Sequence, residues 1–316
     1  MRQNSPNQSM TDPPVSILIA TYNQANFVEE TLISALEQEY DPLEVVVADD
    51  GSSDDTPRII TRIQRKYPGR LFPILGERNV GITGNCNRAL RRCGGRFIAL
   101  QGGDDVLLPG KIRKQVDWLS SDDRRVICYH DVDVFDSGTG KTLGLYSTRH
   151  PLRTGDLKDM ILLELFFAST SVMFRSSFAP PGGYDERIPH SSDFLFLLQI
   201  LGRAPRHSEA VGFIPGVFAR YRRHPGNVTR QADLWGLQET LLSLDLIRRD
   251  VPDMTRYVRL ARSERLCSYG LKRLARGRLL EGIHLLLRGG LESIHGLRRS
   301  LASGVRHMKS GRSLFP

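Results

Sequence analysis

Short apolar, β-rich runs alternate with helix-like segments through the first hundred residues of this chain. The runs at 15–20, 43–48, 71–75 and 96–100 have the length of buried strands, and amphipathic segments separate them. Strands and helices that alternate at this spacing form βαβ units, in which parallel strands join one sheet. The sequence therefore predicts an α/β fold of Rossmann-like type, with a mostly parallel sheet sandwiched by helices.

The composition fits a globular protein. The chain has 316 residues, of which 40% are hydrophobic and 25% charged, and this length is enough for a sizeable core. No run approaches the ~18 apolar residues of a membrane-spanning helix. The N-terminal segment lacks the apolar stretch of a secretory signal, and the four cysteines show no metal-binding spacing. We expect a cytoplasmic protein with reduced thiols, and a disordered leader over residues 1–12.

Polar residues follow three of the predicted strands where each strand ends. Thr21, Tyr22 and Asn23 follow the first strand, the acidic run 49–56 follows the second, and GGDD at 102–105 follows the fourth. In a parallel sheet ligands bind at the carboxyl ends of the strands, so we expect these groups to meet there. Converging carboxylates repel one another unless a cation lies among them, and their hard oxygens suit Mg²⁺ or Mn²⁺.

Four segments carry a resemblance to a known family. SILIATYNQANFVEETLISALEQEY, VVVADDGSSDDT, NVGITGNCNRAL and FIALQGGDDVLLPGKI resemble, in this order, the motifs of inverting family 2 glycosyltransferases of the GT-A fold. The resemblance runs from about residue 15 to 227. It implies transfer of a sugar from a nucleotide-diphosphate sugar, most often a UDP-sugar, to an acceptor hydroxyl, with Mn²⁺ or Mg²⁺. It also implies a role in cell-surface polysaccharide or glycolipid synthesis.

The resemblance further implies a domain organisation. A glycosyltransferase domain would span residues 13–230, with a nucleotide-sugar-binding half at 13–108 and an acceptor-binding half at 109–230. Residues 231–316 would form a basic helical C-terminal extension, because the sequence there is rich in leucine and arginine.

Roles on the donor side follow from the resemblance. The residues that it assigns to nucleotide-sugar binding are Thr21, Tyr22, Asn23, Asp50, Arg78 and Asp104. Among them, Asp50 would accept a hydrogen bond from the base, and Asp104 would contact the ribose. Asp105 would ligate the metal that bridges the diphosphate. Relatives often carry another acidic residue where this chain has Gly102, so the resemblance implies one carboxylate fewer near the metal.

Roles on the acceptor side also follow from the resemblance. Asp193, at the start of an apolar helix, would be the general base that takes the proton of the acceptor hydroxyl. The residues alone also allow a helix cap there. Gly182 and Gly183 would belong to the acceptor-side loop. His224, in the segment YRRH, could approach the metal or the diphosphate, or could lie in a basic surface turn.

Other functions compete with this interpretation. A sugar-1-phosphate nucleotidyltransferase would have a glycine-rich basic loop after the first strand, where this chain has ATYNQANF. A catalytically inactive glycan-assembly or glycan-binding protein would not need Asp105 and Asp193, and both are present. A nucleic-acid binder is disfavoured because the basic tail lacks interleaved aromatic residues, zinc spacing and a helix-turn-helix pattern. We expect no nucleic-acid partner.

The basic charge is concentrated at the C-terminal end. From residue 256 onward the chain has 14 Lys and Arg against 3 Asp and Glu, whereas its overall net charge is +9. The leucines there could pack on the catalytic domain and leave a solvated basic face. Alternatively, the segment could rest on an anionic membrane and bring the active site to a lipid-linked acceptor. We expect a nucleotide-sugar donor, a glycan or lipid-linked acceptor, and peripheral contact at the inner face of the membrane.

Overall fold

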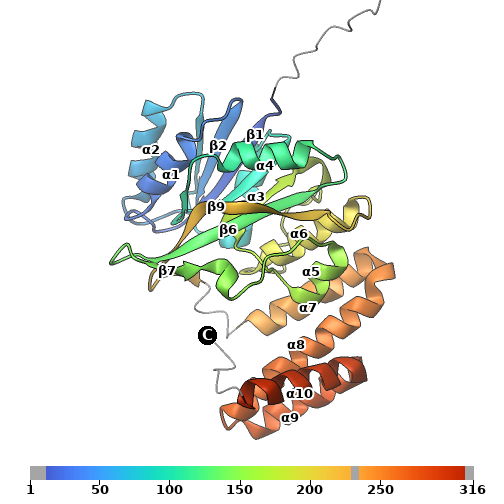
Figure 1. The fold of residues 1–316 in the computed structure, drawn as a ribbon. Helices are drawn as coiled ribbons and strands as arrows, with labels where there is room; N and C mark the ends of the chain where they lie inside the picture. Colours follow the sequence, from blue (N-terminus) through green and yellow to red (C-terminus); the bar gives the residue numbers. More distant parts are fainter. Residues whose placement is uncertain (1–11, 229–234, 310–316) are drawn as a thin grey trace, which may run out of the picture.

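The computed structural model describes residues 12–228 and 235–309, so most of the predicted leader lies outside the described residues. A sheet runs across the molecule in the order β3-β2-β1-β4-β8-β6-β9-β5, and β7 pairs with β6 (Figure 1). The strands are β1 (Val15–Thr21), β2 (Leu43–Asp49), β3 (Leu71–Leu75), β4 (Phe97–Gly102), β5 (Val106–Leu107), β6 (Ile127–Asp136), β7 (Thr142–Leu145), β8 (Met173–Arg175) and β9 (Val211–Arg223).

Helices cover the sheet, and four more α-helices follow the last described strand in the chain. They are α1 (Val28–Leu36), α2 (Thr56–Lys66), α3 (Ile82–Arg92), α4 (Lys111–Ser120), α5 (Leu157–Leu163), α6 (Ser192–Arg203), α7 (Gly236–Asp250), α8 (Thr255–Ala275), α9 (Leu279–Glu292) and α10 (Ile294–Lys309). Among the described residues, no helix combines the length and apolarity needed to cross a bilayer.

The first half of the sheet has the predicted parallel arrangement. β1 pairs in parallel with β2 and β4, and β2 pairs in parallel with β3. Side chains alternate between the faces of a strand, so Ile17 and Ile19 of β1 pack with α1 and α2 on one face. Leu18 packs on the other face, in the core that includes α3 and α6. This frame brings the ends of β1, β2 and β4 to one edge.

The second half of the sheet departs from the parallel pattern. β8 is antiparallel to both β4 and β6, and β5 is antiparallel to β9. Strand β9 was not predicted from the sequence. It is the longest strand among the described residues and runs parallel to β6. Pro215 and Gly216 interrupt its pattern, and the pairing shifts there from His130–Ile214 to Asp131–Val217. A bulge thus accommodates a proline that would otherwise break the strand.

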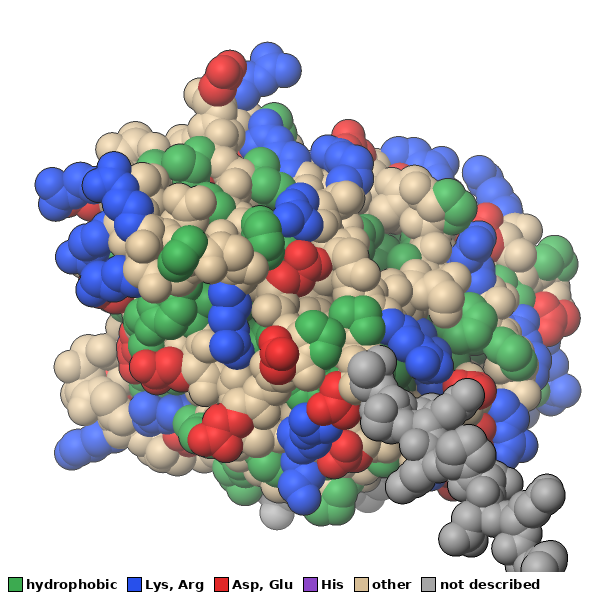
Figure 2. Space-filling model, turned by 90° about the horizontal axis from the view of Figure 1, so that it is seen from above, with side chains coloured by type: hydrophobic (Ala, Val, Ile, Leu, Met, Phe, Trp, Pro, Cys, Tyr) green, Lys and Arg blue, Asp and Glu red, His purple; other side chains and the backbone are tan. Residues whose placement is uncertain are grey.

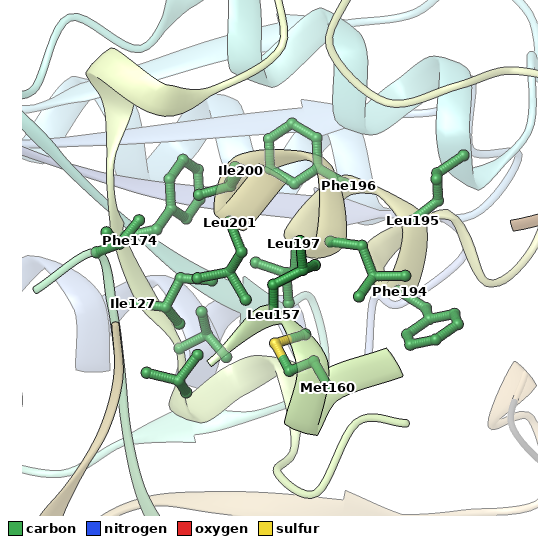
Figure 3. Packing of buried hydrophobic residues seen from close by; sticks show 14 of the residues in the cluster. Ile127, Leu157, Met160, Phe174, Phe194, Leu195, Phe196, Leu197, Ile200 and Leu201 are labelled. Carbon is green, nitrogen blue, oxygen red and sulfur yellow. The ribbon is translucent and has the colours of Figure 1, made fainter. Parts of the chain in front are cut away.

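Helix α6 is buried on nearly all sides. Leu195, Phe196 and Leu197 have no exposed surface, and Figure 3 shows α6 side chains packed toward Leu157 and Met160 of α5. The ring of Tyr184 stacks on Phe196 with 3.9 Å between centroids. Burial of side chains of this size contributes about 1.5–3 kcal/mol each. The packing fixes the position of the first turn of α6, which carries Asp193.

The first helices of the C-terminal extension share the buried core that contains α6. Leu244 and Ile247 of α7, and Val258 of α8, belong to the same buried cluster as α6, and α7 lies beside α6 (Figure 1). Helices α9 and α10, which follow α8 in the chain, lie farther from the sheet (Figure 1). Figure 2 shows the face of the molecule that lies away from α9 and α10. It carries interspersed Lys, Arg, Asp and Glu side chains, without a broad surface of one charge.

Candidate functional site

A cavity of about 1530 Å³ opens at the carboxyl ends of β1, β2 and β4. This volume exceeds the ~300–1000 Å³ of typical small-molecule sites, so two substrates have room to meet in it. Eight of the predicted site residues line the cavity: Thr21, Tyr22, Asn23, Asp50, Asp104, Asp105, Asp193 and His224. Arg78, Gly182 and Gly183 do not belong to its lining, and the side chain of Arg78 is exposed.

The loop after β4 holds two adjacent carboxylates. Asp105 is buried, and its Oδ1 accepts a hydrogen bond of 2.9 Å from the backbone N–H of Arg222. The Nε–H of Arg222 donates to the carbonyl of Asp104 at 2.6 Å. Burial, with the neighbouring charge of Asp104, raises the pKa of Asp105 well above its usual range. The Arg222 guanidinium lies over the rings of Phe27 and Phe135, which fix its position.

The segment after β9 closes on the same loop. His224 Nε2 lies 2.8 Å from Asp104 Oδ2, and the Asn227 side-chain amide donates to the same oxygen at 3.2 Å. The His224 ring also contacts the ring of Phe27, with 4.8 Å between centroids. His224 therefore lies beside Asp104, and its approach to a metal or to the diphosphate stays a prediction. Sequence analysis did not identify Asn227, because its contact partner lies 123 residues away.

The two carboxylates share a space above Gly102. A Cβ added to Gly102 would lie 2.9 Å from Asp104 Oδ1 and 3.0 Å from Asp105 Oδ2. A side chain at this position would displace both oxygens, so glycine leaves room between them. Among the described residues, no three His, Cys, Asp or Glu side chains form a complete metal cluster. The carboxylates fit a hard divalent ion whose remaining ligands come from outside the protein.

Asp50 connects β2 to the loop before α3. Its two oxygens accept hydrogen bonds of 2.9 Å from the backbone N–H groups of Val80 and Gly81. Arg88 lies 3.3 Å from Oδ1. Gly51 has φ +70°, and a Cβ there would lie 2.7 Å from the carbonyl carbon of Arg78. Asp50 thus shapes one wall of the cavity, and Gly51 lets the loop at Arg78 pass close by.

Asp193 projects from the first turn of α6. Its Oδ2 accepts a hydrogen bond of 2.6 Å from Ser169 Oγ, and its Oδ1 accepts one of 2.9 Å from the N–H of Phe194. The helix cap position belongs to Ser191, so Asp193 lies inside the helix and its carboxylate lines the cavity. Burial raises the pKa of Asp193, although these two hydrogen bonds oppose the shift. Such a carboxylate is a stronger base than an exposed aspartate.

Ser169 was not identified from the sequence. The turn that carries it is held by hydrogen bonds from side chains of α4. Gln115 donates from its side-chain amide to the carbonyl of Ser171 at 2.7 Å. The buried Lys111 ammonium donates to Gln115 Oε1, also at 2.7 Å. Burial lowers the pKa of Lys111 to about 7. A chain of polar contacts therefore runs from α4 to the turn that holds the Asp193 carboxylate.

The loop that carries Gly182 and Gly183 is joined to α3. The side chain of Asn87 donates to the carbonyl of Tyr184 at 2.9 Å and accepts from its N–H at 2.7 Å. Gly183 has φ +73°, and a Cβ there would lie 2.3 Å from Asn87 Oδ1. Gly182 has open space around it. The structure thus gives Gly183 a role in positioning the loop, at a distance from the cavity lining.

The family sequence profile described as "Glycosyl transferase family 2" matches residues 16–179. The chain belongs to glycosyltransferase family 2. An uncharacterized protein of Mycobacterium tuberculosis is 31% identical over 225 residues, which cover 69% of this chain and 61% of that protein. An uncharacterized glycosyltransferase of Nostoc is 32% identical over 148 residues, covering 47% of this chain and 45% of that protein. The chain thus spans about three-fifths or less of these two relatives.

Solved structures share the fold of this family 2 member. The crystal structure of S. aureus TarS 1–349 in complex with UDP has a TM-score of 0.63 and 15% identity, covering 94% of this chain and 92% of that chain. The mannosyltransferase PcManGT from Pyrobaculum calidifontis, in complex with GDP-Man and Mn²⁺, has a TM-score of 0.57 and 19% identity, covering 94% and 87%. The predicted GT-A fold with C-terminal helices is confirmed.

We predict that Gly183→Ala lowers the free energy of unfolding, whereas Gly182→Ala leaves it within about 0.5 kcal/mol. The backbone conformation of Gly183 alone costs ~1–2 kcal/mol for a residue with a Cβ, and the contact with Asn87 adds to this. Urea unfolding of both variants checks the difference. Equal stability of the two variants would contradict the role given to Gly183.

Proposed function

We propose that this protein transfers a sugar from a nucleotide-diphosphate sugar, most likely UDP-linked, to an acceptor hydroxyl with inversion at the anomeric carbon. One observation carries the proposal: the donor-side carboxylates Asp104 and Asp105 open into the same cavity as Asp193. Related folds bind suitable donors, since TarS structures contain UDP or UDP-GlcNAc and the PcManGT structure contains GDP-Man. Membership of the family supports glycosyl transfer as the reaction class.

On the donor side, the base is proposed to lie near Thr21, Tyr22, Asn23 and Asp50. Tyr22 supports this, because its half-exposed ring can cover a planar base. Asp104 would contact the ribose. Arg78, whose side chain is exposed, would turn toward the phosphates when the donor binds.

A divalent ion, Mn²⁺ or Mg²⁺, is proposed beside Asp105. The carboxylate oxygens that converge above Gly102 would hold it, with His224 next to them and the donor diphosphate completing its coordination. The bound ion would stabilise the negative charge that develops on the nucleotide diphosphate as it leaves. A side chain at position 102 would displace the two carboxylate oxygens that converge there, so glycine at this position is compatible with the proposed site.

Asp193 is proposed as the general base. Its carboxylate would take the proton of the acceptor hydroxyl while the hydroxyl oxygen bonds to the anomeric carbon. The bond from that carbon to the diphosphate oxygen would break in the same step, on the opposite face of the sugar. A single displacement with Asp193 as base, without a covalent intermediate, inverts the anomeric carbon.

A sugar-1-phosphate nucleotidyltransferase fits this site less well. That reaction needs basic groups on a triphosphate directly after the first strand, and residues 21–24 there are Thr, Tyr, Asn and Gln. An inactive binding protein would not need the hydrogen bond that holds the Asp193 carboxylate at the cavity wall. We place the reaction in cell-surface polysaccharide or glycolipid synthesis, with a glycan or lipid-linked acceptor.

Helix α9 supports the proposal of contact with an anionic membrane at the cytoplasmic face. Leu280, Ile283, Leu287 and Leu291 recur at helical spacing and are 87%, 49%, 66% and 84% exposed. Arg288 is exposed beside this row. Several other basic residues of the extension form ion pairs within the protein, including Arg262 and Arg265. The exposed apolar side chains of α9 would therefore insert into the membrane. The attraction between the basic residues and anionic lipids would be weaker than the net charge suggests.

We predict that Asp105→Asn removes the effect of Mn²⁺ on nucleotide binding and abolishes transfer. The amide keeps the size of the side chain and can still accept from the Arg222 N–H, but it carries no charge for a cation. Thermal shifts with UDP, with and without Mn²⁺, measure this. The exposed control Asp123→Asn should behave as the parent. Full turnover and a parent-like Mn²⁺ effect in Asp105→Asn would overturn the metal assignment.

We predict that Asp193→Asn keeps donor binding but lowers kcat by roughly 10²-fold or more, as removal of a general base does. Because the pKa of Asp193 is raised, the parent should lose kcat/KM on acidification at a higher pH than an ordinary aspartate would give. The variant should lack this acidic limb. Asp117→Asn, on an exposed position of α4, is the control. A folded Asp193→Asn enzyme with the parent rate would exclude Asp193 as the base.

We predict that the parent sediments with vesicles of anionic lipid, more at low salt than at high salt, and less with neutral vesicles. The double variant Leu280→Glu/Leu287→Glu should lose this binding, whereas Leu75→Glu, an exposed leucine on β3, should retain it. Unchanged binding by the double variant, or none by the parent, would exclude a lipid surface as the partner of α9. Sedimentation velocity without lipid would show whether a second copy covers this row instead.

A further inference from the structure

A buried carboxylate of the C-terminal extension lies against the segment that begins the helix of the proposed base. Glu239, in the first turn of α7, is only 6% exposed. It accepts hydrogen bonds from the backbone N–H of Ser191 at 2.8 Å and from that of His190 at 3.2 Å. It also accepts from Ser191 Oγ at 2.8 Å and lies 2.7 Å from His190 Nδ1. One carboxylate thus joins two residues that are 48 or 49 positions away in the chain.

These contacts act on the entry of α6. Ser191 is the residue at the cap position of α6, and its own side chain makes no capping hydrogen bond to the helix. N–H groups at a helix start need acceptors, and a negative charge there is favourable. Burial opposes ionisation of Glu239, but the hydrogen bonds from His190 and Ser191 outweigh it and lower the pKa of Glu239. The negative charge of Glu239 is therefore stabilised at the N-terminus of α6, where a negative charge is favourable.

The same contacts shape the cavity wall. His190 lines the cavity together with Asp193. The imidazole of His190 is fixed from two sides, by Glu239 and by the ring of Trp235, which stacks on it with 4.7 Å between centroids and 13° between planes. Trp235 and Glu239 both belong to the start of the extension, beyond the predicted end of the catalytic domain at residue 230. The extension therefore supplies part of the wall beside the proposed base.

We propose that Glu239 is a positioning residue for the acceptor site: through Ser191 and His190 it fixes the first turn of α6, and with it the Asp193 carboxylate and the wall on which the acceptor lies. This inference rests on the proposed function of Asp193. The first turn of α7 then belongs to the proposed acceptor site, while α9 remains available for contact with a membrane. Loss of Glu239 would misplace the base and leave the donor side, which is built from other elements, intact.

Two variants and one matched control test this role. Glu239→Gln keeps the size of the side chain and removes its charge, and Glu239→Ala removes its hydrogen bonds as well. The control is Asp245→Asn, which removes a carboxylate from the same helix that pairs with Arg248 and Arg262 instead. We expect both Glu239 variants to lower kcat at least tenfold with less than a twofold change in the KM for the donor. The control should match the parent.

Two further readouts separate positioning from loss of fold. The negative charge of Glu239 contributes to the raised pKa of Asp193, so the acidic limb of the kcat profile should move to lower pH in Glu239→Gln. Hydrogen exchange at the amides of His190 and Ser191 should become faster in Glu239→Ala and stay unchanged in Asp245→Asn. A parent-like kcat and acidic limb in folded Glu239→Gln would overturn the inference.

The same design distinguishes this inference from the proposed function. If the parent transfers sugar and the Glu239 variants match it, the inference fails alone. If the parent and Asp193→Asn show the same rate, the proposed function of Asp193 fails. In that case the hydrogen-exchange result still decides whether Glu239 holds the start of α6, and unchanged exchange in Glu239→Ala would contradict that part as well.

Discussion

Two adjacent carboxylates, Asp104 and Asp105, are held against their mutual repulsion at the edge of the sheet by the end of β9 and the residues that follow it. The backbone and guanidinium of Arg222 bind this loop, and His224 and Asn227 bind the Asp104 side chain. The end of β9 therefore has to meet the end of β4. The antiparallel pairing of β5 with β9, beside this loop, makes that meeting possible.

The part of the cavity that holds Asp193 depends on a different constraint, the fixed position of one helix. Helix α6 is almost entirely buried, so its core contacts determine where its first turn lies. Three polar connections then hold that turn: Thr83 of α3 binds the carbonyl of Ile188, Ser169 binds Asp193, and Glu239 binds Ser191. Each comes from a different part of the chain. The Asp193 carboxylate, the proposed base, is thereby held in one orientation without contact with substrate.

Local patterns predicted the first half of the molecule well. Apolar runs and helical periods alternate there without interruption, so the strands could be recognised. Because these strands pair in parallel, the residues after Ala20, Ala48 and Leu100 lie at one edge of the sheet, as predicted. Strand β9 escaped prediction because Pro215 and Gly216 interrupt its pattern. Ser169, Asn227 and Glu239 escaped prediction because their roles depend on contacts with residues 24 to 123 positions away, which no local spacing encodes. Among the predicted site residues that line the cavity, Asp193 lies in the first turn of α6, and the others lie at or just after the ends of β1, β2, β4 and β9. Arg78, Gly182 and Gly183 lie outside that lining.

We propose that Asp193 acts as the base of a single displacement in this cavity. The most direct measurement is the anomeric configuration of the product, determined by NMR, when the protein transfers from the α-linked UDP-sugar that stabilises it most. A single displacement with Asp193 as base predicts a β-linked product. An α-linked product would exclude a single backside displacement with Asp193 as base.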